Sequence, residues 1–550
     1  GLTDTFTLTL SGNQWPAIIS PTVVELAPCS STLALITVTI PLSATWDAQD
    51  TVTVTAVSHI SPSATSVISF SSKTPAGILL VDDDRFYNRE QDYLEALAAQ
   101  GNRADRWDTR WGFGIADSPP ITLLRLYPLV IWFNGYDWFD PIQPAEEDTL
   151  GQYLDGGGRL LFSSQASLFY TELSAFTRNY LGVAAIDYED TFSNVVGGPD
   201  TVIGDGFAGG SLLDEMNRFP YFWNLSTAVQ PLTGTQVILR GDSGQPAGLA
   251  RAGASTSSAS GSADWRTVFM PFAFEALTTT AKADLMNRAV GWLSWLGASW
   301  LFPHEDQIAA GDTVTFTIAL RADDVISPAL GITPTVTISA PVAEHLFVVS
   351  STLTGWSDHH AGEWSGALQA GMALTWTFVA TTSASLSAGE MLTAWLRVNI
   401  SQPDLAFTRH AATRVGGPRV ISSLTVAPAS PQWGGLITAT ARMTNVGSIA
   451  APGARMTSVV PIALSLLTPT VQGPSIGSVA VSRNRIDWAG ALASGEAITL
   501  TYQMSAPAFG GPQRDFYHAV LVDDGSGALS QSARWISPGT QNRFLPLVLR

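Results

Sequence analysis

The hydrophobic pattern of this chain changes twice, and the changes divide it into segments with different folds. Up to residue 74, threonine or serine alternates with apolar residues, as in Thr51–Thr55 (Thr-Val-Thr-Val-Thr). Between 76 and 297, continuous apolar runs alternate with helical segments, and after Phe302 the alternation with period two returns. Period two indicates half-buried antiparallel strands, whereas continuous apolar runs between helices indicate buried parallel strands. One core cannot hold all 550 residues, because single cores stop growing at roughly 250–300 residues.

The middle segment is expected to form one α/β domain. Its predicted strands are Gly77–Val81, Leu129–Phe133, Arg159–Ser163 and Thr267–Phe272. Its predicted helices are Asn88–Gln100, a stretch that opens at Pro144, and Lys282–Leu296. Strands that alternate with helices predict a doubly wound parallel sheet.

The C-terminal half contains an internal repeat. Trp364–Leu368 reads Trp-Ser-Gly-Ala-Leu, and the pattern returns at Trp488–Leu492 as Trp-Ala-Gly-Ala-Leu. Two tandem β-sandwiches are therefore expected in this half. The expected domains are a small sandwich over 1–74, the α/β domain over 76–297, sandwiches over 304–415 and 420–537, and an apolar tail over 538–550.

The charge and cysteine content exclude several classes of partner and site. Lys+Arg 28 against Asp+Glu 46 gives a net charge of −18, which repels nucleic acid and anionic membrane surfaces. A single cysteine, Cys29, excludes an intramolecular disulfide and a cysteine-built metal site. No stretch approaches the ~18–20 apolar residues of a membrane span, so none is expected.

Two parts of the chain resemble segments of bacterial exported proteins. Asp4–Leu10, with Trp15-Pro16 and Leu26–Pro28 after it, is similar to the Ig-like sandwich downstream of the catalytic domain in bacterial subtilisin-like exoproteases. Cys29 stands where that family usually has glycine. The two Trp-x-Gly-Ala-Leu segments look like the conserved β-sandwich repeat of bacterial surface proteins. These resemblances imply an extracellular or cell-surface location.

The middle segment resembles a further family. Ile78–Asp84, Leu154–Leu160 and Phe274–Leu277 look like the class I glutamine amidotransferase-like, flavodoxin-like α/β domain found in such exoproteins. The expected fold class is therefore multidomain and mainly β, with Ig-like sandwiches flanking one doubly wound α/β domain.

The α/β domain lacks the groups that its relatives use for catalysis. Amidotransferase activity needs a cysteine after the strand Leu160–Phe162, supported by a histidine, and this chain has Ser163–Gln165 there. All seven histidines lie outside 75–303. A nucleophile with a histidine base cannot be assembled inside this domain, so we expect no catalytic residues and no enzyme activity.

Acidic clusters are the candidate cation sites. Asp82, Asp83 and Asp84 end the first α/β strand, where open α/β sheets bind ligands. The sequence leaves two interpretations open: Ca²⁺ relieves the repulsion of the three carboxylates, or they cap the next helix. Ca²⁺ is the only cofactor that the sequence suggests. A second cluster, Asp187, Glu189 and Asp190, is expected to be a solvated loop.

Histidine and tryptophan clusters point to weaker candidates. Asp358-His359-His360 is expected in a hairpin loop, where adjacent histidines rarely share one ion. Trp364 and Trp488 recur at equivalent repeat positions, which indicates core packing. Four further tryptophans would line a crevice of the α/β domain and bind a glycan: Trp107, Trp111, Trp132 and Trp138.

The first sandwich is expected to lack its first strand. In the last sandwich, the strand Ile437–Met443 leads through the turn Thr444–Gly447 into the next strand, and Gly1–Asp4 looks like the end of such a turn. A sandwich without an edge strand invites strand donation from another chain. Phe544–Leu549 of a neighbouring subunit is one candidate donor, although Pro546 cannot donate to a ladder. The alternative is a shortened piece, or a precursor whose upstream fragment stays bound.

Three functional hypotheses follow. The first is a non-catalytic structural or assembly protein of the cell surface, self-associating into a filament by strand donation. The second is an accessory binding module, for glycan or peptide, of a secreted subtilisin-like protease. The third is a hydrolase that uses the α/β crevice.

Overall fold

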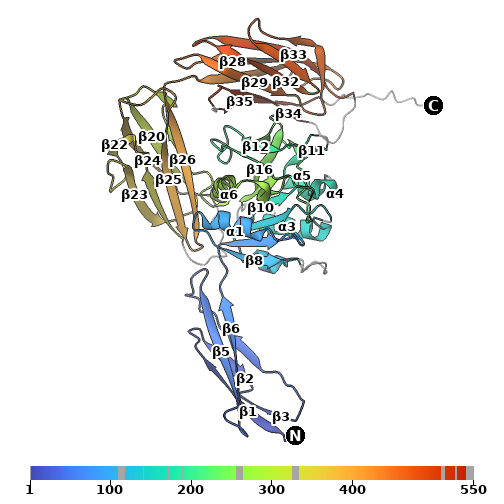
Figure 1. The fold of residues 1–550 in the computed structure, drawn as a ribbon, viewed down its shortest axis with the longest axis vertical. Coiled ribbons are helices and arrows are strands. Elements are labelled where there is room, and N and C mark those ends of the chain that lie inside the picture. The colour runs from blue at the N-terminus through green and yellow to red at the C-terminus, as the bar shows by residue number, and fades with distance from the viewer. Residues whose placement is uncertain are drawn as a thin grey trace, which may run out of the picture.

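The structure is a computed structural model that describes most of residues 2–539. The stretches left out within this range are 110–117, 140, 171–172, 189, 218, 255–263, 325–333, 509–514 and 527–528. The protein is multidomain and mainly β, as the sequence predicts (Figure 1). In the described residues, no helix has the length and apolar character to cross a membrane.

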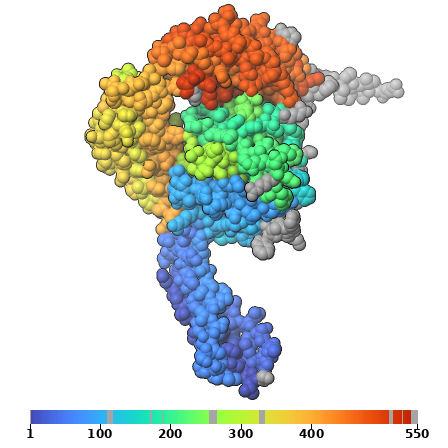
Figure 2. Space-filling model, in the orientation of Figure 1, coloured from blue at the N-terminus to red at the C-terminus, as the bar shows by residue number. Residues whose placement is uncertain are grey.

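The N-terminal unit protrudes from the rest of the molecule as a narrow arm (Figures 1 and 2). A four-stranded antiparallel sheet, ordered β3-β1-β5-β6, faces a two-stranded sheet, β2-β4. The strands are β1 (Asp4–Ser11), β2 (Ala17–Ser20), β3 (Val23–Leu26), β4 (Leu35–Val38), β5 (Gln49–Ser58) and β6 (Thr65–Lys73). Threonine and valine alternate along β5, so the hydroxyls and the apolar side chains lie on opposite faces.

The middle of the chain forms the α/β unit, which is built on a nine-stranded sheet ordered β13-β12-β15-β16-β17-β10-β9-β7-β8. Its strands are β7 (Ile78–Asp82), β8 (Ala104–Asp108), β9 (Leu129–Gly135), β10 (Arg159–Ser164), β12 (Asn194–Gly197), β13 (Gly210–Ser211), β15 (Gln236–Gly241), β16 (Pro246–Ala254) and β17 (Asp264–Met270). The strands from β17 to β8 are parallel neighbours. Four of them contain the continuous apolar runs that predict buried parallel strands, whereas β8, which reads Ala-Asp-Arg-Trp-Asp, was not predicted. A separate antiparallel pair consists of β11 (Val183–Asp187) and β14 (Ala228–Pro231).

The prediction of a wholly parallel sheet is wrong for the other half. β16 pairs antiparallel with β17, and β15, β12 and β13 extend the sheet in the same antiparallel manner. A parallel pair needs a crossover of a dozen or more residues, whereas β15 and β16 are joined by a tight turn at 242–245. The sequence did not predict this antiparallel extension, because its strands are short and contain glycine and proline.

Helices cover both faces of the parallel half. α1 (Glu90–Ala98) and α6 (Thr279–Leu293) pack together on one face, and α3 (Pro144–Asp155) lies on the other. α3 begins at the predicted Pro144, where the Glu146 carboxylate accepts the Gln143 N–H at 2.7 Å. The shorter helices are α2 (Ile121–Leu124), α4 (Ser167–Tyr170), α5 (Ala175–Asn179) and the 3₁₀ turn η1 (Phe274–Ala276).

Two sandwiches follow, which share the same spatial order of eight strands and differ in one edge strand each, β19 in the first and β31 in the second. Sandwich A has the sheets β18-β20-β24-β22 and β19-β26-β25-β21-β23, and sandwich B has β27-β28-β33-β30 and β31-β32-β29-β34-β35. The strands of A are β18 (Trp300–Pro303), β19 (Gln307–Ile308), β20 (Thr313–Arg321), β21 (Thr335–Pro341), β22 (Leu346–Ser351), β23 (His360–Ala367), β24 (Ala373–Thr382), β25 (Met391–Ser401) and β26 (Leu405–Val415). Those of B are β27 (Val420–Ala427), β28 (Leu436–Asn445), β29 (Ala451–Val459), β30 (Ser465–Gln472), β31 (Ser478–Ser482), β32 (Arg485–Leu492), β33 (Ala497–Ser505), β34 (Phe516–Asp523) and β35 (Leu529–Ile536). Trp364 on β23 and Trp488 on β32 occupy equivalent positions, so the sequence repeat is also a structural one.

The α/β unit and sandwich A share one continuous hydrophobic core, because α6 packs against β26. A buried ion triad lies at the same junction. Asp323 of sandwich A accepts a hydrogen bond from Arg159 at 2.7 Å and another from Arg266. All three side chains are almost wholly shielded from water, so each charge depends on the others for compensation.

Candidate functional site

The N-terminal unit leaves an apolar face uncovered at β6. Val67, Ile68 and Phe70 are 61%, 56% and 44% exposed, although β6 lies in a four-stranded sheet. Among the described residues of this unit, the buried hydrophobic ones are Trp15, Val52 and Val54. Large apolar side chains are rarely left in contiguous exposed patches unless another molecule covers them.

Register shows which face of β6 is incomplete. Phe70 lies opposite Val52 and Ile68 lies opposite Val54 in the antiparallel β5–β6 pair. Directly opposite residues share a face, so Ile68 and Phe70 continue the apolar face that buries Val52 and Val54. Val67 belongs to the other face, opposite Thr55. The covering sheet β2-β4 therefore shields β5 but not β6.

Sandwich B shows what would complete this unit. The pairings β1–β3, β1–β5, β5–β6 and β2–β4 match β29–β32, β29–β34, β34–β35 and β30–β33, in the same chain order. In sandwich B, β30 and β33 continue into β28, and β27 packs across β34 and β35. The described part of the N-terminal unit has no counterpart of β27 or β28. The match thus leaves β27, β28 and the edge strand β31 without a described counterpart. Two of these, β27 and β28, precede β29 in the chain, where the sequence suggested a single missing strand.

Two of the exposed apolar residues of the unit, Ile68 and Phe70, lie at one of the open positions. β4 pairs only with β2 among the described strands, so its other edge presents unpaired backbone groups where β28 would lie. β6 corresponds to β35, the strand that β27 covers in sandwich B. β18 crosses β26 in sandwich A in the same way. We define the candidate site as the free edge of β4 together with the apolar face at Ile68 and Phe70.

Cys29 lies in the same unit and is exposed. Its φ is 58°, in the left-handed region that glycine adopts at little cost. The backbone conformation of this turn therefore favours glycine, which is the residue usual at this position in the Ig-like family that the segment resembles.

The three carboxylates at the end of β7 point to different partners. Asp82 forms an ion pair with Arg106 at 2.7 Å. Asp83 accepts hydrogen bonds from Trp132 Nε1 at 3.2 Å and from Asn134 Nδ2 at 2.6 Å. Asp84 accepts the backbone N–H groups of Asn88 and Arg89 just before α1, which is the arrangement that the helix-capping interpretation describes.

No group of three or more His, Cys, Asp or Glu side chains suited to a metal ion occurs in the described residues. Calcium binding at Asp82, Asp83 and Asp84 stays a prediction from the sequence, and the contacts of these three side chains do not support it. Burial, followed by the charge of Asp82, raises the pKa of Asp84 to about 9. Burial also raises the pKa of Asp82 despite the neighbouring Arg106.

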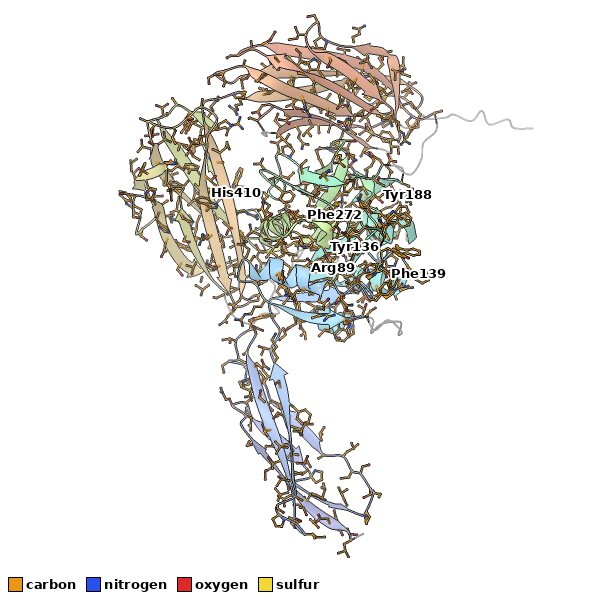
Figure 3. The ribbon with its side chains drawn as sticks, in the orientation of Figure 1. Arg89, Tyr136, Phe139, Tyr188, Phe272 and His410 are labelled. Atoms are coloured by element: carbon orange, nitrogen blue, oxygen red, sulfur yellow. The ribbon has the colours of Figure 1, made fainter. Side chains whose placement is uncertain are left out.

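Glu275 is a buried carboxyl group that the sequence did not single out. It lies in η1, follows Phe274, and is 1% exposed. Tyr93 donates its hydroxyl hydrogen to Glu275 Oε2 at 2.9 Å, and burial raises the pKa of Glu275 to about 7. Arg89 Nη2 donates a hydrogen bond to the Glu275 carbonyl at 3.5 Å. Figure 3 shows Arg89 and Tyr136 near each other in the α/β unit. The only signal in the sequence is an acidic residue inside the apolar run that follows β17.

Ser163, the first of the three residues compared above with the amidotransferase cysteine, is engaged by the backbone. Ser163 Oγ donates to the Phe272 carbonyl at 2.9 Å and accepts the Phe274 N–H at 3.1 Å. His410 of sandwich A reaches the α/β unit, but its ring contacts Arg288 on α6 at 2.8 Å. The hydroxyl of Ser163 therefore holds the loop after β17 in place.

The tryptophans suggested for glycan binding do not form one surface. Trp132 is fully buried and bonded to Asp83, whereas Trp138 is exposed; Trp111 lies outside the described residues. Trp488 is buried in sandwich B and donates to the Ile476 carbonyl, as core packing predicts. Its equivalent Trp364 is partly buried against the core.

The remaining acidic and histidine clusters have structural roles. Asp190 is partly buried, not solvated as expected, because it accepts a hydrogen bond from Gln245 and faces Arg483 and Arg485 of sandwich B across a cavity of about 190 Å³. Glu189 lies outside the described residues. His359 lies in a tight turn closed by backbone bonds between Ser357 and His360, as the hairpin prediction states.

No protein-family model matches the chain, and no curated protein matches it. Among solved structures, it is similar to the Enterococcus faecalis adhesin ACE at 8% identity, over 43% of this chain and 94% of that one, with a TM-score of 0.16. The Staphylococcus aureus collagen adhesin matches at 9% identity over 43% and 91% of the chains, with a TM-score of 0.16. The Corynebacterium diphtheriae pilin SpaD matches at 10% identity over 43% and 64%, with a TM-score of 0.19.

Similarities with TM-scores this low do not establish the fold or the role of this chain. The amidotransferase-like and subtilisin-associated interpretations stay predictions from the sequence.

Proposed function

We propose that this chain is a non-catalytic structural protein of the cell exterior that self-associates through its N-terminal unit into a filament. The observation that carries the proposal is the free edge of β4 beside the uncovered residues Ile68 and Phe70. The sequence resemblances to exported bacterial proteins support the location.

Hydrophobic burial and backbone pairing act together at this site. Covering one large apolar side chain contributes roughly 1.5–3 kcal/mol. Ile68 and Phe70 together therefore offer several kcal/mol to any chain that covers them. The edge of β4 adds main-chain hydrogen bonds, the usual source of affinity in strand addition. A strand from a second copy would satisfy both requirements.

The dimensions of the gap restrict the donor. β27 has 8 residues and β28 has 10, so the complete cover is two strands of that length with apolar residues at every second position. The segment Phe544–Leu549, which lies outside the described residues, is shorter than either and contains Pro546. It would supply part of the cover. A bound precursor fragment or a glycan partner would instead leave the purified chain monomeric.

Sedimentation velocity of the full chain tests the proposal. We expect a concentration-dependent rise in sedimentation coefficient, with elongated particles under negative stain at the highest concentration. A single monomeric species over the whole concentration range would contradict self-association.

A further inference from the structure

A buried arginine at the junction of the α/β unit and sandwich A has no carboxylate partner among the described residues. Arg409 on β26 is 5% exposed. It forms no ion pair with any carboxylate in the described part of the chain, and its Nη2 has no hydrogen-bond partner there. Its other nitrogens make only long contacts, Nε to the Ser299 carbonyl and Nη1 to the Arg288 carbonyl, both at 3.4 Å.

The charges around Arg409 do not compensate it. The charged groups that act on it are Arg288 and Arg266, both positive. Each of these already has its own carboxylate, Asp284 for Arg288 and Asp323 for Arg266. Burial, and then these two charges, lower the pKa of Arg409 to about 9. The guanidinium carbon of Arg409 lies 4.9 Å from the centroid of the Phe407 ring, a contact that offsets only part of the cost of burying the charge. An anion beside the guanidinium would relieve the rest.

Arg409 lines a cavity that can hold such an anion. The cavity has a volume of about 400 Å³ and is lined from both units, by Arg409, His410 and Trp300 of sandwich A and by Arg288 and Thr201 of the α/β unit. This volume is in the range of small-ligand sites. Figure 3 shows His410 on the side of sandwich A that faces α6.

The other groups in the cavity favour a ligand with a ring and hydroxyl groups. Trp300 is 50% exposed, and its ring is 4.8 Å from that of Phe302, so an aromatic surface is present. Asp200 and Asp205 also line the cavity, and their carboxylates can accept hydrogen bonds from the hydroxyl groups of a ligand. Arg288 acts on Asp205, whereas neither Asp acts on Arg409. The cavity thus has an acceptor region and a separate cationic group.

We propose that this cavity binds an acidic sugar, whose carboxylate pairs with Arg409 and whose ring lies on Trp300. The site is independent of the self-association proposed for the N-terminal unit. It differs from the tryptophan group that the sequence suggested, because its residues come from segments far apart in the chain.

Titration calorimetry of the full chain with D-glucuronate tests the proposal, with D-glucose and acetate as matched probes. We expect glucuronate to bind more tightly than either. Arg409→Met should weaken glucuronate binding by roughly 10- to 100-fold, since a charge-assisted hydrogen bond is worth about 1.5–3 kcal/mol.

Trp300→Ala provides a second variant at a half-exposed position, which keeps the test decisive if Arg409→Met does not fold. We expect it to weaken glucuronate binding and leave acetate binding unchanged. Absence of glucuronate binding at millimolar concentration would overturn the proposal. Equal binding of acetate and glucuronate, or wild-type affinity in the Trp300 variant, would overturn the sugar assignment and leave an adventitious ion only.

Discussion

Val52 and Phe70 lie directly opposite each other on the same face of the β5–β6 pair, yet Val52 is 2% exposed and Phe70 is 44% exposed. One apolar face is thus covered on β5 and uncovered on β6. This asymmetry is the basis of the proposed self-association.

Removing the apolar side chains of β6 should weaken the association. We expect Ile68→Ser with Phe70→Ser to shift the sedimentation-derived dissociation constant upward by at least about 100-fold, because two buried side chains contribute roughly 1.5–3 kcal/mol each. Val67→Ser is the matched control, since Val67 is 61% exposed, more than either Ile68 or Phe70, but lies on the opposite face. If Val67→Ser weakens the association by the same factor, any exposed apolar side chain of β6 contributes, and the association does not depend on the face that carries Ile68 and Phe70.

Cys29→Gly should stabilise the N-terminal unit. The left-handed conformation at φ 58° costs a non-glycine residue roughly 1–2 kcal/mol, and the greater unfolded-state freedom of glycine offsets about 0.5–1 kcal/mol. We expect a net gain of about 0.5–1 kcal/mol in denaturant unfolding. Cys29→Ala, which keeps the strain, should give no such gain; a gain there would assign the effect to the thiol.

Stability should fall as pH rises, because of Glu275. Its folded-state pKa of about 7 lies above its ordinary value of 4.5, so the folded chain holds this proton more tightly than the unfolded chain. The resulting stabilisation is complete below pH 4.5 and is lost as pH rises through 7. The loss is on the order of 3 kcal/mol. Asp84, with its pKa of about 9, acts in the same direction.

Glu275→Gln tests this assignment in thermal melts from pH 5 to pH 8.5. We expect the variant to show a shallower decline in melting temperature than the wild-type chain. Parallel pH profiles for the two proteins would assign the decline to other groups.

Breaking the ion triad should separate the α/β unit from sandwich A. Asp323→Ala leaves Arg159 and Arg266 buried without their carboxylate, a change that costs about 3–5 kcal/mol. Calorimetry should then resolve two transitions where the shared core of the wild-type chain gives one. Asp324→Ala alters the exposed neighbour and should leave the melt unchanged; two transitions in that control would argue against a role for the triad.

The sequence predicted four of the five strands of the parallel half, β7, β9, β10 and β17, because they contain continuous apolar runs. It missed the edge strand β8, which reads Ala-Asp-Arg-Trp-Asp and is only partly buried. The helix that opens at Pro144 was predictable for a similar local reason, since proline and the Glu146 cap mark its first turn. The antiparallel extension through β15 and β16 was not, because parallel and antiparallel pairing depends on how a turn closes.

The candidate sites depend on contacts that no local pattern contains. Alternation along β5 predicts that Val52 faces a core, but it does not reveal that the cover stops before Phe70. Arg409 lies in an alternating strand like any exposed arginine. Its burial and its lack of a carboxylate follow from the docking of α6 on β26, which links segments far apart in the chain.

Completing the N-terminal unit covalently tests the central claim most directly. Residues 420–450, which contain β27, β28 and the turn into β29, would replace residues 1–3 ahead of Asp4. The matched control is the same graft carrying Leu424→Asp and Ile437→Asp, at two positions buried in sandwich B.

The measurement is sedimentation velocity over a concentration series, with binding of an apolar dye as a second readout. The account predicts that the intact graft remains monomeric and binds less dye, whereas the control graft associates like the wild-type chain. Undiminished association and dye binding of the intact graft would contradict the claim that this unit works by accepting strands.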